Sequence, residues 1–406
     1  MFSSAARGEG DGLVGRAAEL VPLLRGNAAR TEGERRVVDE NLAALAGAGL
    51  LRLTVPRRLG GHEVSVRTLV RVGAELARGC GSTAWVSTLI NAGNWLVALF
   101  PRRVQREVWG SGPDVRVCSV LSPAGVWREA DGGRVVTGKW GFASGSLHSR
   151  WAVLGLPLGE AADGQPAEQG VALIPMADLT VEDTWYVAGL RGTGSNTLVA
   201  ADVFVPAYRV MSLTRAIGGE HGTEREREHE DEDEDEGLYR AALVPVLALV
   251  LAGPQVGLAK AALEAVMESL AGGRGISGTC YGRARDAPFV QTQLAEAAQL
   301  VDTAELHMLR CADDIDDWAA RGAYMPLLGR ARARMDTGYI ARCAREAIDR
   351  LLSVQGAGGF AESAPLQRIW RDQETASRHA LVNPALATEL YGRALLGVEE
   401  RITPLI

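Results

Sequence analysis

The order of helical and strand patterns along the 406-residue chain predicts an α+β fold in three parts. Apolar residues recur every three or four positions over residues 1–112 and 238–406, which predicts an N-terminal helical domain and a C-terminal helical bundle. Short β-branched runs between Gly, Pro and Asp turns fill residues 113–212 and predict a central β-barrel or sandwich. Residues 213–237 contain an acidic run and are predicted to form a disordered loop.

The N-terminal helical prediction rests on two amphipathic stripes, one from Leu13 to Leu24 and one from Val66 to Ala77. A Pro- and Gly-containing loop, Leu53 to His62, separates these stretches. A third helix is expected to run to Ala98, with Ser82 or Thr83 as its N-cap because a short hydroxyl side chain accepts a backbone N–H.

In the β region, strand-like runs cover 116–121, 134–136, 151–154, 171–174 and 198–205. The stretch from Arg134 to Gly155 indicates two strands joined by a loop rich in Gly, Ser and aromatic residues. Judged on its residues alone, this stretch is an ordinary hairpin with a glycine loop. The alternative is that the backbone and small hydroxyls of this loop face a flat ligand.

The C-terminal region carries helical stripes at Leu294 to Met308 and at Ile340 to Leu352, and then a break at Gly356 to Gly359. A final amphipathic segment runs from Leu366 to Leu396. The most apolar run, Ala241 to Ala259, is interrupted by Pro245, Gly253, Pro254 and Gln255, so it predicts a buried core helix in preference to a membrane span.

The formal net charge of −7 is concentrated in one place. The run from Glu224 to Glu236 holds ten acids and two arginines, a net charge of −8, so the remainder of the chain is nearly neutral. This distribution predicts no nucleic-acid partner. The five cysteines are widely spaced without a Cys-x-x-Cys pair, so neither a disulfide framework nor a metal site is expected. No secretory signal pattern opens the chain, and a cytoplasmic location is expected.

Several motifs together resemble the acyl-CoA dehydrogenase superfamily, in its branch of two-component flavin monooxygenases. They are the Gly60-Gly61 loop, Gly81-Ser-Thr-Ala-Trp85, Trp140-x-Phe-x-Ser-Gly145, Gly192-Thr-Gly-Ser195, Gln355-Gly-Ala-Gly-Gly359 and Pro365-Leu-Gln-Arg-Ile-Trp-Arg-Asp372. The resemblance covers nearly the whole chain. It implies an N-terminal helical domain, a central β domain, a C-terminal four-helix bundle and a homotetramer in which the glycine segment of one subunit approaches the flavin of its neighbour.

The resemblance also implies a set of flavin contacts. Ser144 would hold the flavin N5 through its hydroxyl or backbone N–H, Phe142 with Ala143 would lie along the ring, and the residues around β-run 116–121 would line its pyrimidine edge. Arg283 would approach the phosphate. The implied cofactor-binding residues are Cys118, Ser119, Leu121, Ser122, Phe142, Ala143, Ser144, Arg283, Gly356 and Gly358.

One position disfavours the dehydrogenase branch without excluding it: many dehydrogenases of this family carry a glutamate base eight residues beyond the residue that corresponds to Asp372, although in some the base comes from elsewhere. This chain has Ala380 there, and an alanine cannot abstract a proton. The preceding residue, His379, matches the histidine of the monooxygenase branch. The resemblance assigns His379, with Ser144, to catalysis, as a group that deprotonates the substrate and steadies the distal oxygen of a flavin C4a-hydroperoxide.

The resemblance therefore implies a monooxygenase that uses O₂ and reduced FMN or FAD from a separate NAD(P)H:flavin reductase. No Gly-x-Gly-x-x-Gly unit indicates a nicotinamide domain in the chain itself. The expected substrate is a small aromatic molecule of secondary metabolism, such as a phenol, indole or polyketide. Alternatives are N-oxidation of an amine such as a nucleotide amino sugar, an acyl-CoA dehydrogenase with a displaced base, and a non-catalytic scaffold.

The substrate-binding residues expected are His379, Asn91, Asn94 and Trp95. Phenol hydroxylases of this branch commonly carry His-Pro-Trp where this chain has Gly93-Asn94-Trp95. Either Asn91 or Asn94 replaces the missing histidine, or the substrate is not a simple phenol.

Overall fold

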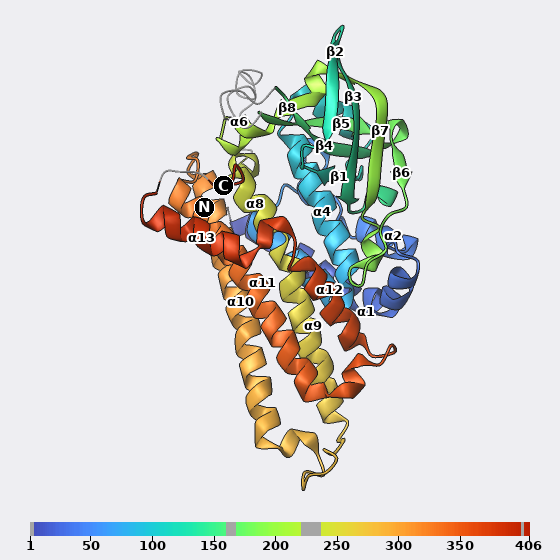
Figure 1. Ribbon diagram of the computed structural model, residues 1–406, viewed down its shortest axis with the longest axis vertical. Coiled ribbons are helices and arrows are strands. Elements are labelled where there is room, and N and C mark those ends of the chain that lie inside the picture. The colour runs from blue at the N-terminus through green and yellow to red at the C-terminus, as the bar shows by residue number, and fades with distance from the viewer. Residues whose placement is uncertain (1–3, 160–167, 221–236, 399–401) are drawn as a thin grey trace.

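The computed structural model describes residues 4–159, 168–220, 237–398 and 402–406, and its helices and strands follow the expected three-part order (Figure 1). The α+β fold, with helical regions on either side of a β region in the sequence, is confirmed. The N-terminal helices are α1 (Ser4–Gly33), α2 (Asp39–Gly47), α3 (Val66–Gly79), α4 (Gly81–Ala98) and α5 (Arg102–Trp109).

Helix α4 is buried on nearly every side, as its apolar composition requires. It lies between the β region and the other helices (Figure 1). A Cβ at Gly93 would lie 2.4 Å from the carbonyl oxygen of Val117, so only glycine allows α4 to approach the first strand this closely. The N-cap prediction was wrong. Cys80 is the N-cap, and Ser82 and Thr83 lie inside the helix, where the Thr83 hydroxyl accepts a hydrogen bond from Asn41.

The central region is a sandwich of two four-stranded sheets. The strands are ordered β1-β4-β5-β8 in one sheet and β2-β3-β7-β6 in the other, with β1 and β4 parallel and the remaining pairs antiparallel. Their bounds are β1 (Val117–Val120), β2 (Gly125–Ala130), β3 (Gly133–Ala143), β4 (Trp151–Pro157), β5 (Gln169–Pro175), β6 (Thr180–Glu182), β7 (Asn196–Pro206) and β8 (Val210–Ser212). Because β3 and β4 belong to different sheets, the stretch Arg134 to Gly155 crosses between the sheets and is not a hairpin.

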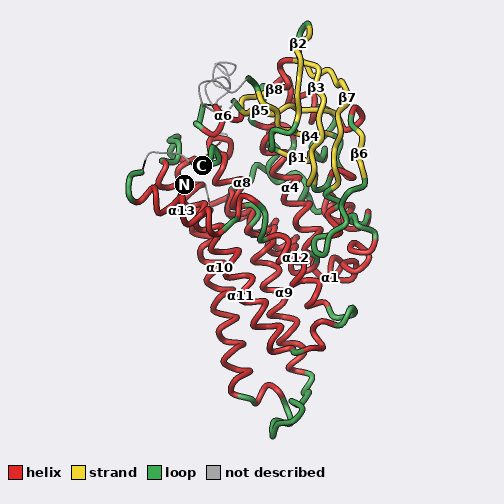
Figure 2. The backbone as a smooth tube through the Cα atoms, viewed as in Figure 1, coloured by secondary structure: helices red, strands yellow, loops and turns green. Residues whose placement is uncertain are grey.

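The C-terminal region is built on long helices that lie side by side (Figure 2). The helices are α8 (Leu243–Leu249), α9 (Ala252–Ala271), α10 (Pro288–Ala320), α11 (Leu327–Gln355), α12 (Pro365–Ala376) and α13 (Pro384–Leu395). The apolar stretch Leu243–Ala271 is long enough to span a membrane, but 89% of its most apolar window is buried inside the protein. It is a core element, as its sequence predicts.

Two further expectations need correction. Residues 213–237 are not a continuous loop, because α6 (Leu213–Ile217) begins there with the Ser212 hydroxyl as its cap and with Leu213 buried. The final amphipathic segment is broken into α12 and α13 by a turn that ends at Asn383-Pro384. The acidic run Glu224–Glu236 lies outside the described residues.

Candidate active site

The last residues of β3 depart from regular strand geometry. The pairing of β3 with β7 shifts register between Trp140 and Ala143, and Phe142 adopts φ +64°, a rare value for a residue with a Cβ. Trp140 anchors the strand from inside the sandwich through a 2.9 Å hydrogen bond from its indole N–H to the carbonyl of Gly155. The bulge leaves the Phe142 ring 77% exposed, edge-on to Trp185 at 5.7 Å between ring centroids. Strained backbone that presents an apolar ring to solvent is typical of a binding site.

Ser144 lies directly after this bulge, in a chain of hydroxyl groups. Its Oγ is 2.6 Å from Oγ of Ser195, which is 2.6 Å from Oγ1 of Thr193, and the Thr193 hydroxyl donates to the carbonyl of Leu190 at 2.8 Å. All three hydroxyl residues are buried, including Ser144, whose loop was expected to present its hydroxyls to a flat ligand. The backbone N–H of Ser144 already donates to the carbonyl of Phe142, so the hydroxyl is the group left for a ligand.

The loop that carries Thr193 and Ser195 is fixed to helix α12. The N–H of Leu190 donates to Oδ1 of Asp372 at 2.6 Å, and a Cβ at Gly189 would lie 1.9 Å from the carbonyl of Arg371. Burial raises the pKa of Asp372 to about 7, despite the opposing hydrogen bond from Leu190. A buried carboxyl therefore connects the loop beside Ser144 to the helix that precedes His379.

His379 occupies the turn after α12, not a helix. Its Nδ1 accepts a 3.2 Å hydrogen bond from the N–H of Leu381 at the start of η9 (Ala380–Val382), and its ring lies edge-on to Trp85 with centroids 6.1 Å apart. The side chain remains accessible to solvent, yet protein surrounds it densely enough that burial lowers its pKa to about 4, with a further contribution from Arg334. A ring that is both enclosed and accessible lines a recess.

The neutral His379 has a defined tautomer. Because Nδ1 accepts the Leu381 N–H, the proton of the neutral imidazole lies on Nε2. The resting side chain therefore offers a hydrogen-bond donor, not a base, to whatever occupies the recess. Arg334 on α11, which is 1% exposed and donates to the carbonyl of Leu405 at 2.6 Å, adds positive charge nearby.

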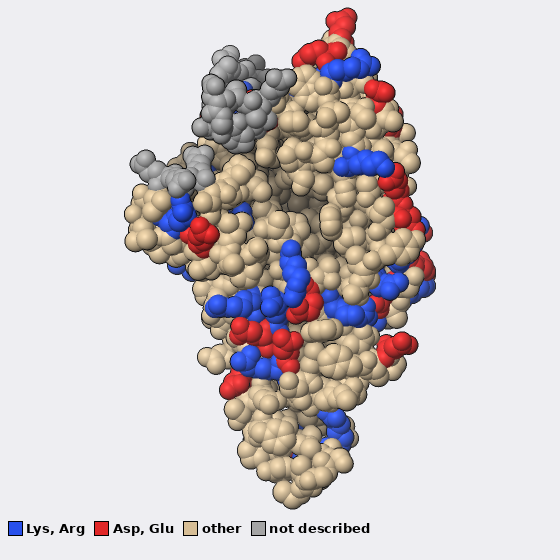
Figure 3. Space-filling model, in the orientation of Figure 1, with Lys and Arg blue, Asp and Glu red and all other residues tan. Residues whose placement is uncertain are grey.

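Helix α4 brings Ser144 and His379 to one region. A Cβ at Gly145, next to Ser144, would lie 3.1 Å from Val86, and the adjacent residue Trp85 contacts His379. The loop after β3 and the turn after α12 thus meet the same turn of α4. On the face drawn in Figure 3, the surface is hollowed between the sandwich and the helices, and charges of both signs are mixed.

The residues expected along the pyrimidine edge of the flavin point alternately to the two faces of the strand β1 and its extension. Cys118 points into the sandwich, with Sγ 3.6 Å from the carbonyl of Trp151, and burial raises its pKa to about 12. Ser119 and Leu121 lie on the opposite face of this edge, half-buried, while Ser122 is exposed. Ala143 is buried and pairs with Asn196. Cys118 could therefore contact a flavin only through its backbone, because its side chain is inside the sandwich.

The three substrate-binding candidates on α4 hold the fold together. Both amide protons of Asn91 are used, on the carbonyls of Leu50 and Ser87, and Trp95 donates to the carbonyl of Leu238. Asn94 donates to the carbonyl of Leu51 at 3.0 Å, but its buried Oδ1 has no partner among the described residues. Of the three, Asn94 alone retains a free polar atom.

Arg283, Gly356 and Gly358 lie at the other end of the bundle. Arg283 is exposed and pairs with Asp286, and Gly356 follows the last residue of α11 with φ +71°. Arg274 joins the two segments, because its side chain donates to the carbonyl of Gln355 and its carbonyl accepts from Ala284. From Arg334 to Gln355, α11 extends for about 30 Å. Within one chain, these residues are therefore remote from His379.

Sequence reasoning missed four residues that contribute to this site. Thr193 and Ser195 stand in a quoted motif, and the available signal was that two hydroxyl residues flank a glycine. In the structure Gly194 has φ +54° and the two hydroxyls meet. The role of Asp372 was not visible, because its partner Leu190 is 182 residues away in the sequence. Arg334 carries no local signal in the sequence.

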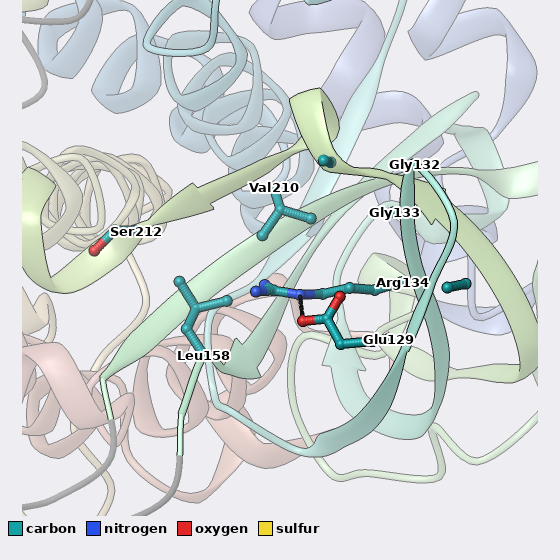
Figure 4. A pocket seen from close by; sticks show the side chains of 9 residues that line it. Glu129, Gly132, Gly133, Arg134, Leu158, Val210 and Ser212 are labelled. Carbon is teal, nitrogen blue, oxygen red and sulfur yellow. Dashed lines mark ion pairs between the residues drawn. The ribbon is translucent and has the colours of Figure 1, made fainter.

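One pocket of the sandwich is lined by neither Ser144 nor His379. A cavity of about 450 Å³ is bordered by the β2–β3 hairpin and by Leu158, Val210 and Ser212, with Arg134 and Glu129 pointing toward one another at its side (Figure 4). None of its lining residues is an expected site residue. In the part of the chain that the structure describes, no group of three or more His, Cys, Asp or Glu side chains is arranged to hold a metal ion.

Comparison with known proteins agrees with this architecture. The family models "acyl-CoA dehydrogenase, N-terminal domain" and "acyl-CoA dehydrogenase, C-terminal domain" match residues 18–111 and 249–384. The chain is 36% identical over 382 residues to "flavin-dependent monooxygenase, oxygenase subunit HsaA" of Rhodococcus jostii (strain RHA1), covering 93% of this chain and 97% of that protein. The chain therefore belongs to the acyl-CoA dehydrogenase family.

Two further relatives narrow the branch. "FADH(2)-dependent resorcinol hydroxylase, oxygenase component" of Rhizobium sp. (strain MTP-10005) is 36% identical, with 96% of this chain and 95% of that protein covered. The solved structure of XiaF from a Streptomyces species, in complex with FADH2 and glycerol, superposes with a TM-score of 0.89 at 36% identity, over 99% of this chain and 98% of that one. Within the family, this chain is an oxidoreductase of the flavin-dependent monooxygenase branch, related to its oxygenase components.

Proposed function

We propose that this protein is the oxygenase component of a two-component system that hydroxylates a small aromatic substrate. It would use O₂ and reduced FMN or FAD from a separate reductase, and act through a C4a-hydroperoxyflavin. The observation that carries the proposal is the meeting, on one turn of α4, of the Ser144 loop with a neutral histidine, His379. The name of the resorcinol hydroxylase supports both the reduced cofactor and the aromatic substrate.

The residues at the end of β3 fit a flavin. Phe142 offers an exposed apolar ring to a flat heterocycle, and the buried Ser144 hydroxyl lies two residues further along the chain. The bound reduced flavin would supply the two electrons and the oxygen-activating chemistry. The protein's part is to hold the ring, exclude water and position the substrate.

His379 would act as a hydrogen-bond donor. Its Nε2–H would bind the phenol or phenolate oxygen of the substrate, which orients the aromatic carbon that is to be hydroxylated. This role replaces proton abstraction, the role expected from the sequence. A base at Nε2 would have to give up the Leu381 contact, and a group with a pKa near 4 is a weak base at neutral pH.

The acyl-CoA dehydrogenase alternative has less support in the structure. Its base would have to come from a carboxylate near Ala380. Glu374 is engaged with Arg345 and Arg378, and Glu389 with Arg393. Neither glutamate is a free base in the resting protein.

The remote position of Arg283, Gly356 and Gly358 supports a homotetramer. We propose that these residues serve the flavin of a neighbouring subunit, because the length of α11 from Arg334 to Gln355 separates them from the His379 region of their own chain. Light scattering in solution tests the assembly, and a monomer at working concentration would contradict it.

A cytoplasmic location and a role in secondary metabolism complete the proposal. The relative named "pigment production hydroxylase" from Rhodococcus supports the latter.

The test is product formation in single turnover. The protein loaded with reduced flavin is mixed with O₂ and a panel of resorcinol, p-hydroxyphenylacetate and indole-3-acetate, the compounds in the names of its relatives. A hydroxylated product from at least one member supports the proposal. Peroxide alone from every member, together with anaerobic bleaching of oxidised flavin by acyl-CoA, would support the dehydrogenase instead.

A further inference from the structure

The hydroxyl chain beside Ser144 has a fixed direction. The carbonyl of Leu190 can only accept, so the single hydroxyl proton of Thr193 points to it. Thr193 Oγ1 must then accept the proton of Ser195, and Ser195 Oγ must accept the proton of Ser144. Each step follows because a hydroxyl has one proton to donate. The Ser144 hydroxyl is left with lone pairs only.

The carbonyl that sets this direction is itself immobile. It also accepts the indole N–H of Trp185 at 2.9 Å and the backbone N–H of Thr193 at 3.1 Å. The N–H of the same residue, Leu190, is held by Asp372 at 2.6 Å. The Leu190 carbonyl, which accepts the last proton of the hydroxyl chain, is therefore held in place by hydrogen bonds at both the N–H and the C=O of Leu190. The three hydroxyls cannot all reverse direction without breaking a contact to Leu190.

The two redox states of a flavin differ at the atom that Ser144 is proposed to meet. Reduced flavin carries a proton on N5 and donates a hydrogen bond there, whereas oxidised flavin has a lone pair on N5 and accepts one. An acceptor-only hydroxyl matches the reduced state and meets the oxidised state lone pair to lone pair. We propose that Thr193 and Ser195 fix the Ser144 hydroxyl as an acceptor, and that this makes the site select reduced over oxidised flavin. The inference rests on the proposed function, because it takes Ser144 as the N5 contact.

Selection of this kind suits an oxygenase that receives its flavin from another protein. The site would retain the reduced form that it uses and release the oxidised form that it makes. Thr193 and Ser195 touch neither the ring nor the substrate in this account, so they are positioning residues that act through Ser144.

The test measures dissociation constants for both redox states, with oxidised FMN and FAD titrated in air and the reduced forms titrated anaerobically. In Ser195→Ala, the proton of Ser144 is free to turn toward oxidised N5. We expect the preference for reduced flavin to fall about tenfold, the value of one hydrogen bond. Thr193→Val should act in the same direction, because Ser195 can then turn its proton toward Ser144. Thr193→Ser keeps the hydroxyl and should restore the preference.

Thr197→Val is the matched control. It removes a hydroxyl–hydroxyl contact, Thr197 with Thr184 at 2.8 Å, from β7, the strand that follows Ser195, without touching the hydroxyl chain to Ser144. If Ser195→Ala and Thr193→Val weaken both redox states equally, or leave the ratio of the two constants unchanged, the hydroxyls only hold the loop and the inference is wrong. If the unaltered protein binds no reduced flavin, the proposed function itself fails.

Discussion

Replacing Asp372 by asparagine should stabilise the protein progressively as the pH rises. Asp372 is 6% exposed, and burial raises its pKa to about 7 from the ordinary value of 3.8. For an acid whose pKa is raised by folding, the unfolded chain loses its proton first, so the unfolded state binds fewer protons and stability falls as pH increases. The loss begins near the unfolded pKa of 3.8 and is complete above the folded pKa of about 7.

The size of the effect follows from these two values. Between pH 5 and pH 8, ionisation of Asp372 should cost the folded state about 2.5 kcal/mol. Asparagine is nearly isosteric and its amide oxygen can still accept the Leu190 N–H, but it does not ionise. The variant should therefore gain about 2.5 kcal/mol relative to the unaltered protein over this range, whatever constant offset the substitution introduces.

Urea denaturation of both proteins at several pH values measures this difference. Asp178→Asn, at an exposed position, is the control and should show a constant offset. A difference between Asp372→Asn and the unaltered protein that stays constant from pH 5 to pH 8 would refute the reasoning. It would mean that Asp372 is ionised in the fold, or that it is reached by water.

Three further substitutions test other parts of the structure. His379→Ala should lower the product formed per flavin oxidised about a hundredfold, because the substrate loses a hydrogen-bond donor. In the unaltered protein the product yield should not change with pH above about pH 6, because the pKa of His379 is near 4. A step in the yield near pH 6.5 would show a histidine that is not enclosed. Trp140→Phe removes the indole N–H that donates to the carbonyl of Gly155 and should cost about 1–3 kcal/mol in thermal or urea unfolding. A neutral result would mean that the Gly155 carbonyl does not depend on the indole. Gly93→Ala places a methyl 2.4 Å from the carbonyl oxygen of Val117 and should destabilise the protein by about 1–3 kcal/mol. Gly26→Ala, with open space around it, is the control and should be neutral or stabilising. Equal melting temperatures for these two variants would contradict the packing of α4 on β1.

The fold was predictable because its signals are local. Helical periodicity, short β-branched runs and Gly or Pro breaks are each read within about ten residues, and the strand runs at 151–154 and 171–174 reappear as β4 and β5. The partner of each strand was not readable. β3 and β4 look like the arms of a hairpin, yet they belong to opposite sheets, because pairing depends on residues far apart in the sequence.

The site was predictable only in part, for the same reason. The sequence singled out Ser144, Phe142 and His379, and the structure brings their segments to one helix, α4. It could not reveal that Asn91 donates to the carbonyl of Leu50 or that Trp95 donates to the carbonyl of Leu238, since these partners lie more than thirty residues away. Nor could it show the direction of the Ser144 hydroxyl, which is set at Leu190, 46 residues along the chain.

The most direct test of the central claim is rapid mixing of the protein, loaded anaerobically with reduced flavin, with oxygenated buffer while the flavin spectrum is recorded. The account predicts an oxygenated flavin species, distinct from the reduced and oxidised forms, that builds up before oxidised flavin appears. Its decay should coincide with product formation when an aromatic substrate is present. A single conversion to oxidised flavin at the rate of free flavin in solution would contradict the account, because the Ser144 and His379 region would then neither hold nor protect the cofactor.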